Sequence, residues 1–90
     1  MNYLSLDTLN KIKEKYDKDI LLKINMNNFN KIIDLLEFYK IDNIKDIVIY
    51  NLYLFLDDYN LVEERLIKLY TIYKEDLNKF INKNIKLLNK

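Results

Sequence analysis

The chain contains no cysteine, histidine, glycine, proline or tryptophan, and several of these absences exclude a class of chemistry. Without cysteine or histidine there is no disulfide framework, no thiol nucleophile, no imidazole acid or base, and no zinc site of the usual Cys/His type. Without glycine the phosphate-cradling loops of nucleotide-binding proteins cannot form, because their backbone must approach the ligand closely. We therefore expect a protein that is not an enzyme and that holds no cofactor and no metal ion.

The chain also has little net charge and no long apolar run. Its 15 Lys and Arg residues against 14 Asp and Glu residues give a formal net charge of +1, which provides no global attraction to nucleic acid or to an anionic membrane. The start Met1-Asn2-Tyr3-Leu4 lacks the basic region and apolar run of a signal peptide, and no apolar segment approaches the roughly 20 residues that span a bilayer. We expect a soluble protein of the cytoplasm or another intracellular compartment, with no membrane partner.

What the chain does have is the composition of a folded protein. Of its 90 residues, 50% are hydrophobic and 32% charged, and this length suits one domain. No alternating strand pattern and no glycine-containing hairpin turn occurs in it. The sequence therefore predicts an all-α domain, a short helical-repeat fold of about five to seven helices.

The most apolar segment, Ile44 to Leu56, is ambiguous when read alone. Its β-branched and aromatic residues favour a strand, and periodicity cannot assign so short a run. A lone strand would leave its backbone groups unpaired, however, and no partner strand is predicted. We therefore predict a helix from about Asn43 to Tyr50, followed by a tight turn from Leu52 to Leu56.

Apolar residues at spacings of three and four predict the remaining helices. Their expected starts are Ser5, Asp17 or Asp19 (before a short helix over Ile20 to Ile24), Asn28, Leu61 (for a helix to Tyr73) and Glu75. The end of the last helix is open, because the apolar pattern allows one straight helix to Lys90, whereas the internal repeat described next predicts a break near Asn84.

An internal repeat emerges when the chain is compared with itself. Shifted by 33 residues, Ile44 falls on Leu77, Val48 on Ile81 and Asn51 on Asn84. Shifted by 34 residues, Ile32 falls on Leu66 and Tyr39 on Tyr73. The predicted unit is a helix, a short loop, a second helix, and an Asn followed by a compact apolar turn. This divides the single domain into an N-terminal divergent half-repeat (1–27) and two repeats (28–60 and 61–90).

This unit resembles the repeat of the mitochondrial transcription termination factor (mTERF) family, which combines two helices with a shorter third turn. In that family the second helix usually leads into Asn-Pro-x-Leu-Leu, and Asn51-Leu52-Tyr53-Leu54-Phe55 and Asn84-Ile85-Lys86-Leu87-Leu88 occupy its place here. Leu52 and Ile85 replace the proline, and the chain holds fewer units than family members do. The resemblance implies an α-solenoid fragment and binding of nucleic acid along a basic groove.

Two groups of lysines are candidate nucleic-acid contacts. Because each group recurs at helical spacing, its members would share one helix face and could contact phosphates. The C-terminal stripe consists of Lys79, Lys83, Lys86 and Lys90, and the N-terminal stripe of Lys11, Lys15 and Lys18. Such stripes are also typical of the solvated side of an amphipathic helix.

Four residues near the apolar turn are candidate protein-interface residues. Tyr53 and Tyr59 are expected to be exposed, where tyrosine makes good binding contacts because it is large and rigid and has a polar tip. Asp57 and Asp58 lie between them and could add an acidic surface for a basic partner. The same carboxylates also suit helix capping, which requires no ligand.

Three functions remain open. The leading hypothesis is a small regulatory protein that binds another protein, because a near-neutral surface with exposed tyrosines suits a protein better than a phosphate backbone. Pairing of copies through the terminal helices would accompany it. The second hypothesis is a nucleic-acid-binding protein that uses the lysine stripes. The third is a mobile-element or viral inhibitor of a host system, such as an anti-CRISPR protein. The small size suggests it, and so does the enrichment in Asn, Lys, Ile, Leu and Tyr, because most of their codons are AT-rich.

Overall fold

The computed structural model describes residues 3–89, and within them the chain forms α-helices and 3-10 helices but no strand. In chain order the elements are α1 (Leu6–Lys15), α2 (Lys18–Leu22), α3 (Met26–Phe38), α4 (Ile44–Tyr50), η1 (Leu52–Leu56), α5 (Tyr59–Tyr73), η2 (Lys74–Asp76) and α6 (Leu77–Lys83). The predicted all-α class is confirmed. No helix of the described residues combines the length and the hydropathy that crossing a membrane requires.

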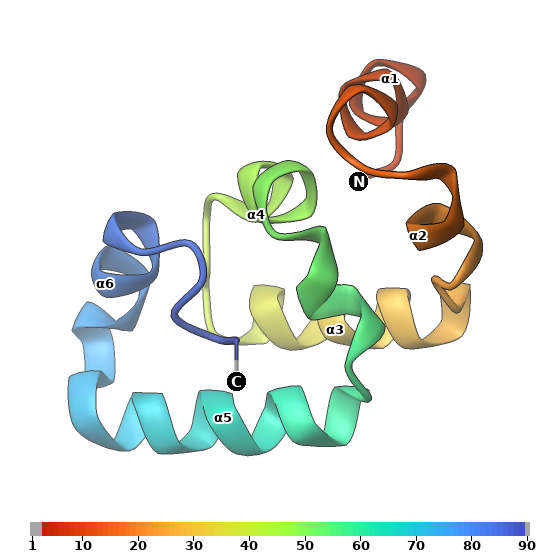
Figure 1. The fold of residues 1–90 in the computed structure, drawn as a ribbon. Helices are drawn as coiled ribbons and strands as arrows, with labels where there is room; N and C mark the ends of the chain where they lie inside the picture. The colour runs from red at the N-terminus through yellow and green to blue at the C-terminus, as the bar shows by residue number, and fades with distance from the viewer. Residues whose placement is uncertain (1–2, 90) are drawn as a thin grey trace.

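The helices form two layers (Figure 1). The first layer contains α3 and α5, which pack against each other and run in the same direction. The second contains α1, α4 and α6, which lie across the first layer and are viewed nearly end-on in Figure 1. The core fills the space between the layers. Its fully buried members include Ile32 and Leu36 of α3, Ile47 and Val48 of α4, Leu66 of α5 and Ile81 of α6.

The segment Ile44 to Leu56 lies at the centre of this core. It forms α4 and then η1, as predicted, and Leu52, Leu54 and Phe55 have no exposed surface. Asn51 separates the two elements with φ −141° and ψ 50°. Its N–H still donates to the Ile47 carbonyl, and its own carbonyl accepts from the Leu54 N–H. One helix therefore ends and a tighter turn begins without any glycine.

The same backbone pattern recurs 33 residues later. α6 ends at Lys83, the Asn84 N–H donates to the Phe80 carbonyl (3.1 Å), and the Asn84 carbonyl accepts from the Leu87 N–H (2.9 Å). The break expected near Asn84 is confirmed, and the alternative of one straight helix to Lys90 is wrong. Lys90 itself lies outside the described residues.

The predicted helix starts are correct to within two residues. Ser5 is the N-cap of α1, and its hydroxyl accepts from the Thr8 N–H. α3 begins at Met26 rather than Asn28, because Asn25 Oδ1 caps it by accepting from the Asn28 N–H (3.0 Å). α5 begins at Tyr59 rather than Leu61, with Asp58 as its N-cap.

Two lysines occupy backbone positions that usually belong to glycine. After α3, Lys40 has φ 59°, while the Ile41 N–H donates to the Leu36 carbonyl (3.0 Å) and the Lys40 N–H to the Glu37 carbonyl (2.9 Å). These two bonds form a Schellman motif, whose left-handed residue is normally glycine. After α5, Lys74 has φ 53° and ψ −127°. In a chain without glycine, both helices of the first layer thus end on a strained lysine.

Three side chains bridge segments that are distant in sequence. The Tyr16 hydroxyl donates to the Ile49 carbonyl (2.9 Å) and accepts from the Leu52 N–H (3.3 Å), which joins the end of α1 to the end of α4. Asn28 Nδ2 donates to the carbonyl of Asp57 (2.8 Å), and its Oδ1 accepts from the Tyr59 N–H (2.9 Å). α3 is thereby joined to the start of α5.

The third bridge is Asn51, whose side chain is 1% exposed. Its Nδ2 donates to the Ile85 carbonyl (3.0 Å) and to Asn89 Oδ1 (2.9 Å), and its Oδ1 accepts from Asn89 Nδ2 (2.9 Å). A buried amide must find such partners, because an unpaired one would cost roughly 1 to 3 kcal/mol. The end of α4 is therefore tied to the turn that follows α6.

Candidate protein-interaction groove

A groove runs along the line where α3 and α5 meet. A hollow of about 420 Å³ occupies one part of it and is lined by Lys31, Asp34, Leu35, Phe38, Tyr39, Tyr59 and Glu63. A larger hollow of about 780 Å³ continues past the ends of the helices and is lined by Phe38, Tyr39, Lys40, Tyr70, Lys74, Glu75, Leu77 and Asn78. Because Phe38 and Tyr39 line both, the two hollows form one surface, which we call the α3/α5 groove.

Aromatic rings form the middle of the α3/α5 groove. Phe38 and Tyr39 make an edge-to-face pair with centroids 5.2 Å apart, and Tyr39 lies 5.5 Å from Tyr70. Phe38 is 77% exposed and Tyr70 43% exposed. Rings this exposed gain free energy when a partner covers them, and aromatic residues are enriched in the cores of protein interfaces.

The exposure of Phe38 follows from helix geometry. Phe38 and Tyr39 are adjacent at the end of α3 and so point about 100° apart. Tyr39 packs against the core, whereas Phe38 is exposed and lines both hollows of the groove. Phe38 and Tyr70 were not among the interface residues predicted from the sequence, although an aromatic pair at the end of an amphipathic helix was a signal for one exposed ring.

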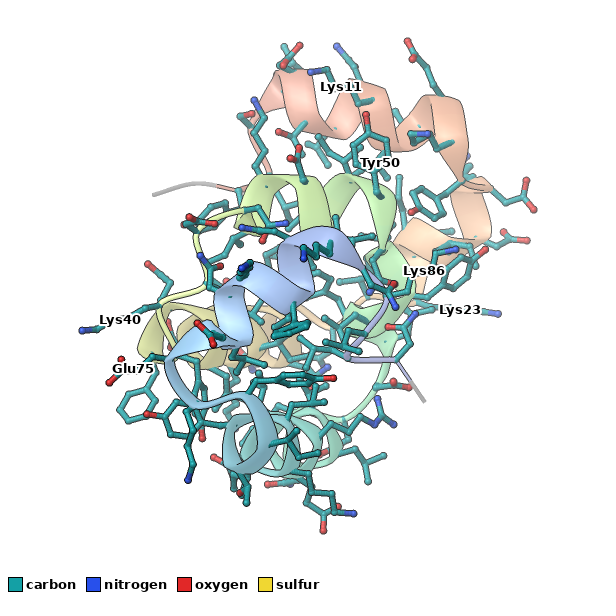
Figure 2. All side chains as sticks on the ribbon, turned by 90° about the vertical axis from the view of Figure 1, so that its left-hand side faces the viewer. Lys11, Lys23, Lys40, Tyr50, Glu75 and Lys86 are labelled. Carbon is teal, nitrogen blue, oxygen red and sulfur yellow. The ribbon has the colours of Figure 1, made fainter. Side chains whose placement is uncertain are left out.

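The charges along the α3/α5 groove are segregated. Asp34 and Glu63 lie at one end, where the Lys31 ammonium is 4.5 Å from the centre of the Tyr59 ring. Lys40 and Lys74 lie at the other end together with Glu75. Figure 2 shows Lys40 and Glu75 at the same edge of the molecule, with Lys40 extending away from the ribbon. Formally, one end is thus acidic by one charge and the other basic by one charge.

The lysine stripes do not form one basic surface. Because α6 ends at Lys83, Lys86 lies in the following turn and not on the helix that carries Lys79. Figure 2 places Lys11 on the uppermost helix and Lys86 well below it, with Tyr50 between, so the two ends of the chain do not bring the stripes together. Lys18 is exposed on α2.

Several lysines of the stripes are also engaged locally. Lys11 pairs with Asp7 (3.5 Å), Lys15 lies 4.7 Å from the centre of the Tyr50 ring, and Lys83 lies 5.8 Å from that of Phe80. These are weak surface interactions. They nevertheless show that acidic and aromatic groups are interspersed with the lysines.

The four residues near the apolar turn have different environments. Tyr53 is 52% exposed and packs edge-on against Tyr16 with centroids 5.5 Å apart. Tyr59 was expected to be exposed but is half-buried, because its ring packs on the core while its edge lines the groove. Asp57 pairs with Arg65 (2.7 Å), and Asp58 caps α5 by accepting from the Asn60 N–H (2.8 Å).

Two further observations concern the acidic side chains of residues 3–89, their grouping and the pKa of Asp42. The described residues contain no group of three or more acidic side chains placed to hold a metal ion. The clear pKa effect is at Asp42, where hydrogen bonds with the side chains of Asn78 and Asn82 lower the pKa of the carboxyl against a small opposing effect of burial. Asp42 lies between α3 and α4, and these bonds attach its loop to α6. This role is structural.

Comparisons with protein-family models, with curated proteins and with solved structures returned no match for this chain. The α3/α5 groove and the charges along it therefore carry the functional argument.

Proposed function

We propose that this chain is a non-enzymatic binding module, a small regulatory protein that acts by binding another protein through the α3/α5 groove. The observation that carries the proposal is the 77% exposure of Phe38 at the point where the two hollows meet. An exposed ring in a concave surface with aromatic neighbours has the composition of a binding hot spot. The groove also offers both signs of charge, which would orient a partner.

The charge distribution favours a protein over nucleic acid as the partner. Phosphate backbones are bound by sets of Lys and Arg residues that together release counterions. Here the groove is lined by three lysines and three carboxylates, and the lysine stripes are separated. A protein surface, which presents apolar and charged groups side by side, is the better match.

A comparison of two serine variants tests this proposal. Phe38→Ser removes the central ring, while Leu22→Ser removes a side chain that is equally exposed (73%) on α2, away from the groove. Tagged wild-type and variant proteins are expressed in the source cells, and co-purified proteins are identified by mass spectrometry. We expect Phe38→Ser to lose at least tenfold of a partner that Leu22→Ser retains, with both variants folded by circular dichroism. Equal recovery with both variants would refute the groove as the binding surface.

We also infer that the fold is a short helical repeat of the mTERF type. The support is that Asn51 and Asn84 end α4 and α6 with the same two backbone hydrogen bonds, and that a compact turn follows each. The resemblance implies nucleic-acid binding, so a gel-shift assay is the direct test. If the lysine stripes bind RNA or DNA, a shift at about 50 mM salt should weaken steeply as salt rises.

The hypothesis of an inhibitor from a mobile element or virus concerns the identity of the partner. It agrees with a small chain that binds a protein through one groove. Gene neighbourhood is the direct test, because an inhibitor of a host defence system is expected beside phage or mobile-element genes. Location among unrelated housekeeping genes would contradict it.

A further inference from the structure

The α3/α5 groove is electrostatically self-complementary. Its acidic end carries Asp34 and Glu63, and its basic end carries Lys40 and Lys74. Phe38 lines the hollows at both ends and so lies near the middle. If this surface is turned by 180° about an axis through its middle and placed on itself, each end meets the end of opposite sign. A two-fold axis requires this relation, because residue i of one copy then contacts residue j of the other and the reverse.

We propose that two copies of this chain pair through their α3/α5 grooves, about a two-fold axis close to Phe38. This inference rests on the proposed function in one respect, the use of the same groove. In the pair, Phe38 of each copy enters the larger hollow of the other, beside Tyr39, Tyr70 and Leu77. The acidic end of each copy faces the basic end of the other.

The size of the surface fits a reversible dimer. α3 has 13 residues and α5 has 15, so they are roughly 20 and 22 Å long at 1.5 Å per residue. With the axis close to Phe38, at the end of α3, each copy contributes the parts of the groove on both sides of that residue, and a specific interface at the lower end of the size range buries about 600 Å² per copy. Of the accessible surface of 6045 Å², this is about a tenth, the usual share for a specific interface. Because affinity depends on the fit of the surfaces and not on area alone, the dissociation constant is the quantity to measure.

Charge reversal provides a sharp test, because the two-fold axis doubles every effect. Asp34→Lys places a lysine against the basic end of the other copy twice per dimer. Lys40→Glu likewise places a glutamate against the acidic end twice. The double variant Asp34→Lys/Lys40→Glu exchanges the two ends and restores opposite charges at both contacts. A mixture of the two single variants should form a heterodimer, because the introduced lysine of one copy then faces the introduced glutamate of the other, while the unchanged Lys40 and Asp34 form the second contact.

The measurement is sedimentation equilibrium of the full chain over a concentration series in low-salt buffer near neutral pH. We expect wild type to move from monomer to dimer, each single reversal and Phe38→Ser to weaken pairing at least tenfold, and the double variant to return within about threefold of wild type. Lys13→Glu, a reversal at an exposed position of α1, is the matched control and should leave pairing unchanged. Circular dichroism melting curves establish that every variant is folded.

Two outcomes would overturn the pairing. If wild type remains a monomer at about 0.5 mM, the concentration at which even a weak specific dimer would form, then copies of the chain do not pair. The proposed function would still stand, because a foreign protein could occupy the groove, and the Phe38→Ser recovery experiment tests that separately. If wild type dimerises but Phe38→Ser, Asp34→Lys and Lys40→Glu leave the dissociation constant unchanged, the copies pair through another surface.

Discussion

The buried amide of Asn51 allows a quantitative prediction with an internal control. Asn51 and Asn84 each end a helix with a similar φ, −141° and −139°, while their ψ values are 50° and 93°, so Asn84→Ala serves as the control for losing an asparagine at a helix end. Their side chains differ sharply. Asn51 makes three hydrogen bonds at 2.9 to 3.0 Å, whereas the exposed Asn84 makes one, accepting from the Lys86 N–H at 3.2 Å.

The expected magnitudes follow from these contacts. A net contribution of about 1 kcal/mol per hydrogen bond gives about 3 kcal/mol for Asn51. Because Asn89 is only half-buried, water can replace part of its hydrogen bonding to Asn51 in the variant. We therefore expect Asn51→Ala to lower the free energy of unfolding by about 2 to 3 kcal/mol. Asn84→Ala should cost about 0.5 kcal/mol. For a chain of this length, whose total stability is roughly 5 to 13 kcal/mol, the first loss is large.

Urea denaturation followed by far-UV circular dichroism measures both variants. With a slope near 1 kcal/mol per molar urea, Asn51→Ala should lower the midpoint by about 2 to 3 M and Asn84→Ala by about 0.5 M. Hydrogen exchange adds a local readout. In Asn51→Ala the backbone amides of Leu87 and Asn89 in the C-terminal turn should lose more protection from exchange than the amides of α3 do. Equal midpoints for the two variants would refute the assigned role of the Asn51 amide.

Three further predictions concern strain, a hydroxyl bridge and pH. Lys40→Gly and Lys74→Gly should each raise the unfolding free energy by about 0.5 to 1 kcal/mol in thermal or urea melts. Glycine removes the strain energy of a positive φ, and this gain exceeds the entropy that the unfolded chain gains with glycine. A loss of stability would show that these positions are unstrained. Tyr16→Phe should cost about 1 to 2 kcal/mol by leaving the Ile49 carbonyl and the Leu52 N–H without their shared hydroxyl, and an unchanged urea midpoint would contradict that bridge. The pKa of Asp42 is lowered in the folded state, so its stabilising effect is present above the unfolded value near 3.8 and is lost as pH falls through the lower folded pKa. Urea midpoints of wild type and Asp42→Asn should therefore differ at pH 6 and converge under strongly acidic conditions, and a constant difference would count against this linkage.

Sequence reasoning succeeded where local chemistry decides the structure. The helix and turn of Ile44 to Leu56 were predictable because no partner existed for a strand and because Asn51 is a residue that readily ends a helix. The break at Asn84 was predictable as the counterpart of that ending. At both positions the backbone hydrogen bonds that end the helix and begin the turn span three or four residues, a range that capping rules cover.

Prediction from the sequence failed where one residue type can play several structural roles. Asn25, Asn27 and Asn28 all could cap α3, and the structure uses Asn25 for the cap and Asn28 to bind the segment before α5. No local rule separates these roles, because the second depends on where α5 comes to lie. The choice between Phe38 and Tyr39 has the same origin. The adjacent pair indicates that one ring is exposed, but which of the two the core covers depends on where the other helices lie.

The bridges from Tyr16, Asn28 and Asn51 also have a consequence for how the chain acquires its structure during synthesis. They join residues that are 33, 31 and 34 positions apart, and no side-chain bond observed in residues 3–89 spans more than 40. Once residue 59 has left the ribosome, Tyr16 and Asn28 can complete their bonds, so the first part of the protein can become ordered while the rest is still being made. Asn51 must wait for residues 85–89, so this buried amide is satisfied only after the bridges from Tyr16 and Asn28 can form.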